Sequence, residues 1–147
     1  MPHVAFTIEP AAGWTYAQLE AATIAQTSGA GPVLAAVGFD PSDAKKDVAN
    51  REAALEVAAK EAGVTLPKKK ISWKKPEDKK DVHGLKVRLW QVDGATRSEK
   101  KGPLLVFDAT SADGKAALVG IGFVPADDSS NGDQAIMQSI ESIEAAQ

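Results

Sequence analysis

The sequence predicts a single α+β domain built around an antiparallel sheet. Three runs in the second half of the chain, Leu85–Val92, Leu104–Ala109 and Ala116–Val124, have the composition of strands and are separated by short polar connections. Two segments, Ser42–Gly63 and Ile136–Ile143, have helical periodicity. With 147 residues, the chain falls within the usual size of one domain.

The N-terminal third of the sequence predicts short strands, and it does not decide the secondary structure of one stretch. Val4–Ile8 is a β-type run, and Pro32–Phe39 is a nearly continuous apolar run that predicts an interior strand. Between them, Tyr16–Ala22 has helical composition but leads into the turn residues Ser28–Gly31. A helical turn and an edge strand are therefore both compatible with residues 15–27.

The long helix predicted between Ser42 and Gly63 has an unusually small inner face. Ser42, Asp43 and Asn50 are candidate N-caps, and Gly63 stands where a left-handed C-terminal residue is expected. Because an alanine-rich stripe lets a helix approach closely, we expect it to lie flat on one face of the sheet. The stripe consists of Val48, Leu55, Ala58 and Ala62.

The predicted strand Leu85–Val92 alternates between a core face and a partly wet face. The core face carries Leu85, Val87 and Leu89, and the wetter face carries Lys86, Arg88, Trp90 and Val92. Gly94 and Gly102 are expected to bracket a polar connection, and Asp113–Gly114 predicts a tight turn. The strands from Leu85 to Val124 are therefore expected to form a meander.

The C-terminal segment predicts a second helix packed on the sheet. Ser130 or Asn131 can cap it, and Gly120 and Gly122 leave one face of the last strand thin enough for either the long helix or this helix to pack closely there. Its apolar stripe consists of Ile136, Met137, Ile140 and Ile143.

Composition excludes several classes of function. The net charge of −3 is too small to indicate a nucleic-acid-binding protein, and the absence of cysteine excludes disulfides, thiolate nucleophiles and thiolate metal sites. No run approaches the roughly 20 apolar residues needed to cross a bilayer, and the N-terminus lacks a secretory signal. A mature segment whose export signal lies upstream would begin this way. In that case we expect a periplasmic or cell-envelope location, and otherwise a cytoplasmic one.

The segment Lys68–Asp81 is the most basic part of the chain. It holds seven lysines and three acidic residues, a local net charge of +4. It could contact a phosphate, an acidic partner or anionic lipid headgroups, with an aromatic side chain among the cations. A solvated edge strand whose lysines discourage edge pairing explains the same residues. The candidate binding residues are Lys68, Lys69, Lys70, Trp73, Lys74, Lys75 and Trp90.

A polar loop near the last helix resembles the first half of a calcium-binding loop. Its candidate ligands are Asp127, Ser129, Asn131 and Asp133. The position that requires a bidentate glutamate is Gln138, and a strand rather than a helix is predicted before the loop. Capping of the last helix accounts for these residues, so we expect no metal site.

Catalytic motifs are missing from the sequence. His3 and His83 have no reactive partner close in sequence, and there is no nucleophile elbow, phosphate loop or dinucleotide fingerprint. We therefore expect no enzyme activity and no cofactor. The rival hypothesis is a hydrolase or metal-dependent enzyme centred on His83 with Asp81 or Asp127.

The order of predicted elements resembles one superfamily over nearly the whole chain. Phe6–Ile8 leads to Gly13–Trp14, a long helix starts at Ser42, a turn at His83–Gly84 feeds the meander, and Ile136–Ile143 closes the chain. This pattern resembles the PsbP-like superfamily, which contains the photosystem II extrinsic protein PsbP, the Ran-binding nuclear-import release factor and bacterial envelope lipoproteins of unknown role.

The resemblance implies an antiparallel sheet of about six strands with helices packed on both faces, an α/β/α sandwich. It also favours Glu20–Thr27 as an edge strand paired with Pro32–Phe39. The lipidated cysteine of bacterial members would lie upstream of this segment. No site residue is carried over, because no site motif is present to receive one.

These observations lead us to expect a non-catalytic binding or accessory protein of the bacterial cell envelope. It would act through the lysine-rich edge or through a groove between sheet and helices, on another protein, as a monomer or homodimer. We expect no nucleic-acid partner and no transmembrane segment. A secretion-system chaperone or immunity protein is the alternative, and it should expose an apolar groove and form a defined dimer.

Overall fold

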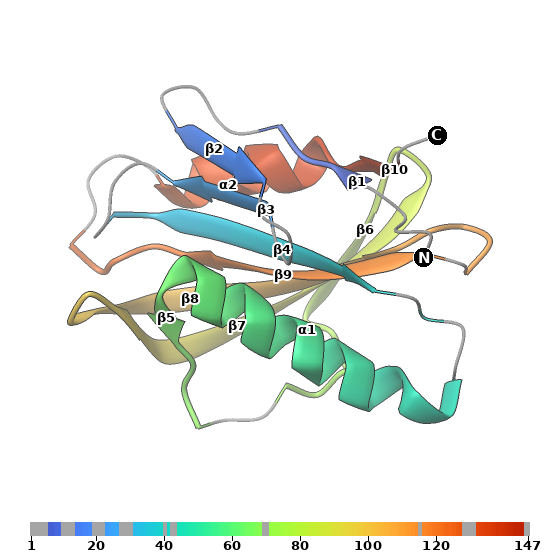
Figure 1. Ribbon diagram of the computed structural model, residues 1–147, viewed down its shortest axis with the longest axis horizontal. Coiled ribbons are helices and arrows are strands. Elements are labelled where there is room, and N and C mark those ends of the chain that lie inside the picture. The colour runs from blue at the N-terminus through green and yellow to red at the C-terminus, as the bar shows by residue number, and fades with distance from the viewer. Residues whose placement is uncertain are drawn as a thin grey trace.

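The computed structural model describes most of the chain, namely residues 6–9, 14–18, 23–26, 31–39, 41, 44–68, 71–114, 116–127 and 132–145 (Figure 1). The two helices are α1 (Asp47–Ala62), preceded by a 3₁₀ turn at Ala44–Lys46, and α2 (Gly132–Glu141). The strands are β1 (Phe6–Thr7), β2 (Thr15–Gln18), β3 (Thr23–Gln26), β4 (Val33–Phe39), β5 (Val64–Thr65), β6 (Asp78–Val82), β7 (Leu85–Arg97), β8 (Lys100–Thr110), β9 (Ala117–Phe123) and β10 (Glu144–Ala145).

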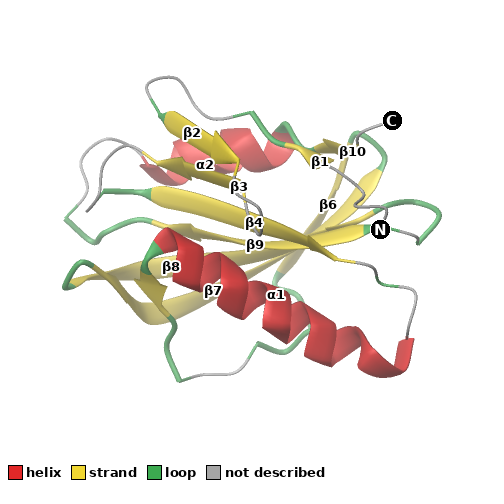
Figure 2. Ribbon diagram, viewed as in Figure 1, coloured by secondary structure: helices red, strands yellow, loops and turns green. Residues whose placement is uncertain are grey.

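A curled antiparallel sheet forms the centre of the molecule (Figure 2). Six strands follow one another in the order β2-β3-β4-β9-β8-β7, and the short strands β5 and β6 both pair with β7. The strands β1 and β10 form a separate antiparallel pair, which brings together the two ends of the described chain. The α+β class with an antiparallel sheet is therefore confirmed, and so is the meander expected from Leu85 to Val124, which β7, β8 and β9 form.

The stretch left open by the sequence contains two strands. Thr23–Gln26 pairs with Val33–Ala36, which confirms the pairing expected for this segment. It is not an edge strand, however, because Thr15–Gln18 pairs along its outer side. Residues 19–22 and 27–30 lie outside the described part of the chain.

The hairpin β7–β8 is longer than the sequence predicted. We expected Gly94 and Gly102 to bracket a polar connection, but both lie inside strands, and the turn is at Ser98 and Glu99, which have positive φ. The strand continues past Val92 through a bulge in which Gly94 adopts a φ of 93°. A bulge absorbs polar, turn-like residues without ending a strand, which explains the error.

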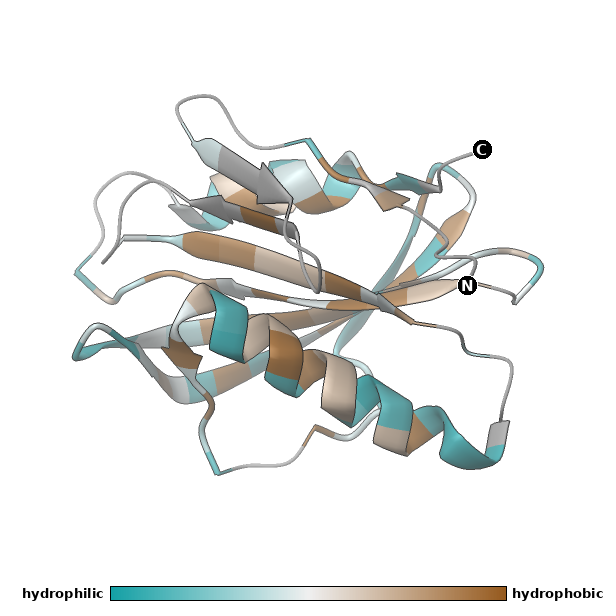
Figure 3. Ribbon diagram, viewed as in Figure 1, coloured by the Kyte–Doolittle hydropathy of each residue, from teal (hydrophilic) through white to brown (hydrophobic). Residues whose placement is uncertain are grey.

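The long helix lies against the sheet as predicted. Figure 3 shows hydrophobic residues along β4 and hydrophilic residues alternating along α1. The helix ends at Gly63, which has the expected left-handed conformation. Val48 is 41% exposed, so the buried face does not include it, and Asn50 lies within the helix instead of capping it. The N-cap is Lys46, which makes no side-chain capping bond, and residues 42–43 are outside the described part.

The second helix packs closely on β9, as the glycines indicated. A Cβ added to Gly122 would lie 2.5 Å from Ile136 Cγ2, so the helix approaches where the strand has no side chain. At Gly120 the expectation of helix packing is wrong, because the ring of Phe107 fills that space. Ile136, Ile140 and Ile143 are buried, whereas the candidate caps at 130–131 are outside the described residues.

The buried residues form two clusters, each containing one helix. One cluster combines α1 with alternate residues of the central strands, including Ala35 and Ile121. The other cluster combines α2 with the residues that alternate with these along the same strands, including Leu34 and Leu118. Because side chains alternate along a strand, neighbouring residues contribute to different clusters.

Candidate functional site

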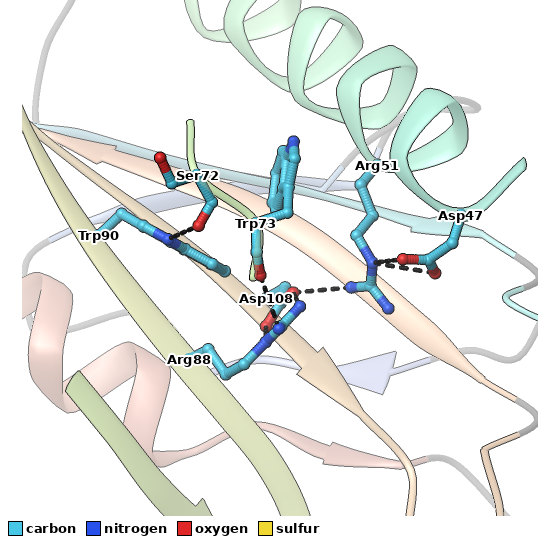
Figure 4. A network of polar contacts seen from close by, with 7 residues as sticks. All are labelled: Asp47, Arg51, Ser72, Trp73, Arg88, Trp90 and Asp108. Atoms are coloured by element: carbon cyan, nitrogen blue, oxygen red, sulfur yellow. Dashed lines mark hydrogen bonds and ion pairs between the residues drawn. The ribbon is translucent and has the colours of Figure 1, made fainter. Parts of the chain in front are cut away.

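The lysine-bearing segment is a loop fixed onto the sheet by two buried tryptophans (Figure 4). We call residues 66–68 and 71–77 the lysine loop. The ring of Trp73 in this loop packs edge-on against Trp90 of β7, with centroids 5.1 Å apart and planes at 71°. The indole nitrogen of Trp90 donates a hydrogen bond to the carbonyl oxygen of Ser72 over 2.8 Å. Aromatic pairs with this geometry contribute about 0.5–1.5 kcal/mol beyond the area they bury.

A buried carboxylate next to the tryptophans organises two arginines. Asp108 of β8 is fully buried and accepts hydrogen bonds from Arg88 Nε over 3.0 Å and from Arg88 Nη2. It also accepts one from Arg51 Nη1 of α1 over 2.7 Å. Arg51 Nε in turn donates to Asp47 over 3.0 Å. Two cations and two anions thus balance each other, which makes the burial of Asp108 tolerable.

The same network holds the lysine loop. Arg88 Nη1 donates to the carbonyl oxygen of Trp73 over 2.8 Å, so one guanidinium joins the loop to the buried carboxylate. Its plane also lies over the Trp90 ring, 5.1 Å from the centroid. The hydrogen bonds to Asp108 raise the pKa of Arg88, against the opposing effect of burial. Two successive loop carbonyls, of Ser72 and Trp73, are therefore fixed by side chains of β7.

The lysines of the loop are presented to solvent. Lys68, Lys74 and Lys75 are exposed, and no ion pair involves them within the described residues. The nearby acids are engaged elsewhere: Glu77 accepts a hydrogen bond from the backbone nitrogen of Gln91, and Asp78 accepts one from the next backbone nitrogen. Among the described residues, the three exposed lysines therefore form no direct ion pair with a carboxylate.

The structure changes the predicted list of binding residues. Trp73 is 5% exposed and Trp90 is 3% exposed, so neither indole is available to a partner. The face of β7 expected to be partly wet is covered at Trp90, because the loop folds over it. The alternative interpretation of the basic segment as an edge strand holds only for Asp78–Val82, which forms β6. Lys69 and Lys70 lie outside the described residues.

The polar network was not predicted from the sequence, although one signal was available. Asp108 interrupts an apolar run, Leu104–Ala109, in which an acidic residue requires a buried partner. Its position opposite Arg88 in the β7–β8 register makes that arginine the first candidate. Arg51 could not be identified in this way, because the helix register does not show which strand it faces.

Of the residues in the rival catalytic hypothesis, His83 and Asp127 lie apart, whereas Asp81 lies in β6, two residues before His83. His83, in the turn between β6 and β7, has its Nδ1 3.1 Å from the carbonyl oxygen of Ile143 and its Nε2 3.8 Å from Glu144. Asp127 pairs instead with Lys100 over 3.2 Å, beyond the other end of β7. That strand has 13 residues, a length of roughly 40 Å.

The calcium-like loop is described only at its ends. Asp127 forms the ion pair with Lys100, Asp133 lies in the first turn of α2, and Ser129 and Asn131 are outside the described part. A strand, β9, precedes the loop, as predicted. Among the described residues, no group of three or more histidine or acidic side chains could hold a metal ion.

Two hollows lie beside the helices. The smaller, about 210 Å³, lies between α1 and the lysine loop and is lined by Leu55, Leu66, Ile71 and Val92, with Glu52, Glu56 and Lys68 among its polar residues. The larger, about 650 Å³, lies between the start of α2 and the strands β7, β8 and β9. We call the larger one the α2 groove. No described helix is long and apolar enough to span a membrane.

Comparison with known proteins supports the fold alone. Neither protein-family models nor curated proteins match the chain. It is similar to a solved structure from Bacteroides thetaiotaomicron, with a TM-score of 0.53 and 10% sequence identity. The alignment covers 97% of this chain and 45% of the other, so this chain spans about half the length of that protein.

Proposed function

We propose that the protein is a non-catalytic binding or accessory protein of the bacterial cell envelope that binds an acidic segment of another protein through the lysine loop. The observation that carries this proposal is the exposure of Lys68, Lys74 and Lys75 on a loop whose backbone is fixed at Ser72 and Trp73 by Trp90 and Arg88. A fixed loop loses little conformational entropy on binding. The charges are therefore presented at small entropic cost.

The chemistry of lysine predicts a tolerant kind of recognition. An ammonium group is a point charge without the planar fork of arginine, so it attracts carboxylates without selecting one geometry. Binding should consequently be weak for each contact, sensitive to salt and dependent on several acidic residues together.

Burial of the tryptophans favours a protein partner over a membrane. Proteins that bind at a membrane interface commonly place tryptophan among the basic residues, with the ring at headgroup level. Here Trp73 is covered and packs against Trp90. The loop therefore offers charge without an exposed aromatic anchor.

The assignment to the cell envelope is supported by the resemblance to the PsbP-like superfamily, which includes bacterial envelope lipoproteins. We propose that the two buried clusters correspond to the two sides of an α/β/α sandwich of that kind, with one helix on each face. Fractionation of cells that express the tagged chromosomal gene tests the location. Recovery with cytoplasmic markers would contradict it.

Charge neutralisation in the lysine loop tests the binding proposal. Replacing Lys68, Lys74 and Lys75 together by glutamine is expected to weaken binding of fluorescent poly-L-glutamate about tenfold or more, at roughly 0.5–1 kcal/mol for each lysine. Fluorescence anisotropy at low and high salt measures the affinity. The melting temperature should hardly change, because within the described residues these side chains form no ion pair.

The matched control removes the same charge elsewhere. Lys60, Lys86 and Lys101 are exposed lysines of α1, β7 and β8, and their joint replacement by glutamine should leave most of the binding intact. An equal loss in both triple variants would show that net charge alone is responsible. Stronger binding to phosphatidylglycerol vesicles than to poly-L-glutamate would assign the loop to a membrane instead.

A further inference from the structure

The α2 groove exists because the second helix is much shorter than the hairpin beside it. A helix of 10 residues is about 15 Å long, whereas the 11 residues of β8 extend over roughly 37 Å. Ile136 of α2 covers the strand at Gly122, but the sheet continues past the start of the helix. The part of this sheet face beyond the start of α2 forms the floor of the groove.

The walls of the groove are mainly apolar and partly accessible. Leu105 of β8, Val124 after β9 and Met137 of α2 are each half-buried and line it together. Its volume of about 650 Å³ lies within the range of sites that hold a small organic molecule. The described residues that line it are Gln91, Pro103, Leu104, Leu105, Gly122, Val124, Pro125, Ala126, Asp133, Ile136 and Met137.

One charged residue, Asp133, stands among the lining residues. Its side chain is exposed, and no ion pair within the described part of the chain involves it. Gln91 adds a polar group on the opposite wall, while its backbone nitrogen is engaged by Glu77. The described lining of the groove thus combines apolar walls with the carboxylate of Asp133.

We propose that the α2 groove binds an amphipathic cation, a molecule with an apolar body and one ammonium head. The apolar body would lie along Leu105, Val124 and Met137, and the head would lie at the Asp133 carboxylate. The sign of that charge, opposite to that of the lysine loop, makes this a second site for a different ligand. The inference does not depend on the proposed role of the loop.

Three fluorescent probes with the same apolar body test the proposal. Diphenylhexatriene carries no charge, its trimethylammonium derivative is a cation, and its propionic acid derivative is an anion. The wild-type chain is expected to bind the cation about three- to tenfold more tightly than the anion, as suits one partly exposed charge pair. Titrations at probe concentrations below aggregation measure the three dissociation constants.

Two substitutions separate the contributions of charge and shape. Asp133→Asn is expected to abolish the preference for the cation while leaving binding of the neutral probe unchanged. Met137→Trp, which fills the groove, is expected to weaken the binding of all three probes. Val124→Gln, which makes the wall polar, provides a second variant should the first one unfold. Circular dichroism melting establishes that each variant is folded.

The control for net charge is Glu56→Gln on α1, which removes one negative charge outside the groove. Its probe preference should equal that of the wild type. The proposal would be overturned if no probe bound, or if both Met137→Trp and Val124→Gln bound the probes as tightly as the wild type. Tighter binding of an uncharged apolar peptide than of the cationic probe would overturn it in favour of a chaperone that cradles apolar segments.

Discussion

Replacement of Asp108 by alanine is expected to destabilise the protein by about 3–5 kcal/mol, because it leaves two arginines without their shared buried anion. Arg51 is 5% exposed and points its Nη1 at this carboxylate, and Arg88 directs two nitrogens to it. Neither guanidinium can lose its charge near neutral pH. The free energy of unfolding, from urea denaturation monitored by circular dichroism, measures the effect.

The control for this substitution is an exposed carboxylate in a similar ion pair. Asp127→Ala removes the partner of Lys100 at the surface and should cost at most about 1 kcal/mol. Replacing Arg51, Arg88 and Asp108 together by apolar residues of similar size should recover part of the lost stability, because no unpaired buried charge remains. A cost below about 1 kcal/mol for Asp108→Ala would contradict the role of the network.

Gly120→Ala is expected to be more damaging than Gly122→Ala, the other glycine substitution in β9. An added Cβ would lie 2.3 Å from the Phe107 ring and 2.8 Å from the carbonyl oxygen of Ala35, so both a buried ring and the β4 backbone would have to move. Forcing extra volume into a packed core commonly costs about 1–3 kcal/mol, and an immobile backbone places this change at the upper end.

Gly122→Ala provides the comparison for Gly120→Ala. There the three atoms nearest to the added Cβ all belong to the side chain of Ile136, so no backbone has to move first. The destabilisation should therefore be smaller, and Ile136→Val in the same chain should relieve part of it. Urea denaturation of the single and double variants checks the order, and equal costs at the two glycines would contradict it.

The strands were predictable wherever their residues alternate or remain apolar for the whole length. Val33–Phe39 and Ala117–Phe123 fit this description, and the structure places both in the interior of the sheet. The hairpin end at Asp93–Arg97 was missed, since a bulge looks like a turn in sequence. Local composition left residues 15–18 open between helix and strand, and pairing with β3 outweighs helical propensity there.

The candidate site was predictable in part. The cluster of lysines is evident in the sequence, and three of them are exposed as the binding hypothesis requires. The burial of Trp90 could not be predicted, because alternation identifies the face of a strand but not what covers that face. The cover is the lysine loop itself, fixed by Arg88, and that contact joins residues 15 positions apart.

The edge-to-face pair of Trp73 and Trp90 gives the chain a built-in optical reporter. Two indoles at this distance and angle couple their electronic transitions, so their circular dichroism depends on the loop remaining docked. Trp14, the third tryptophan, packs instead with the cluster around α2. Detachment of the loop can consequently be followed spectroscopically, without a label and separately from events on the other side of the sheet.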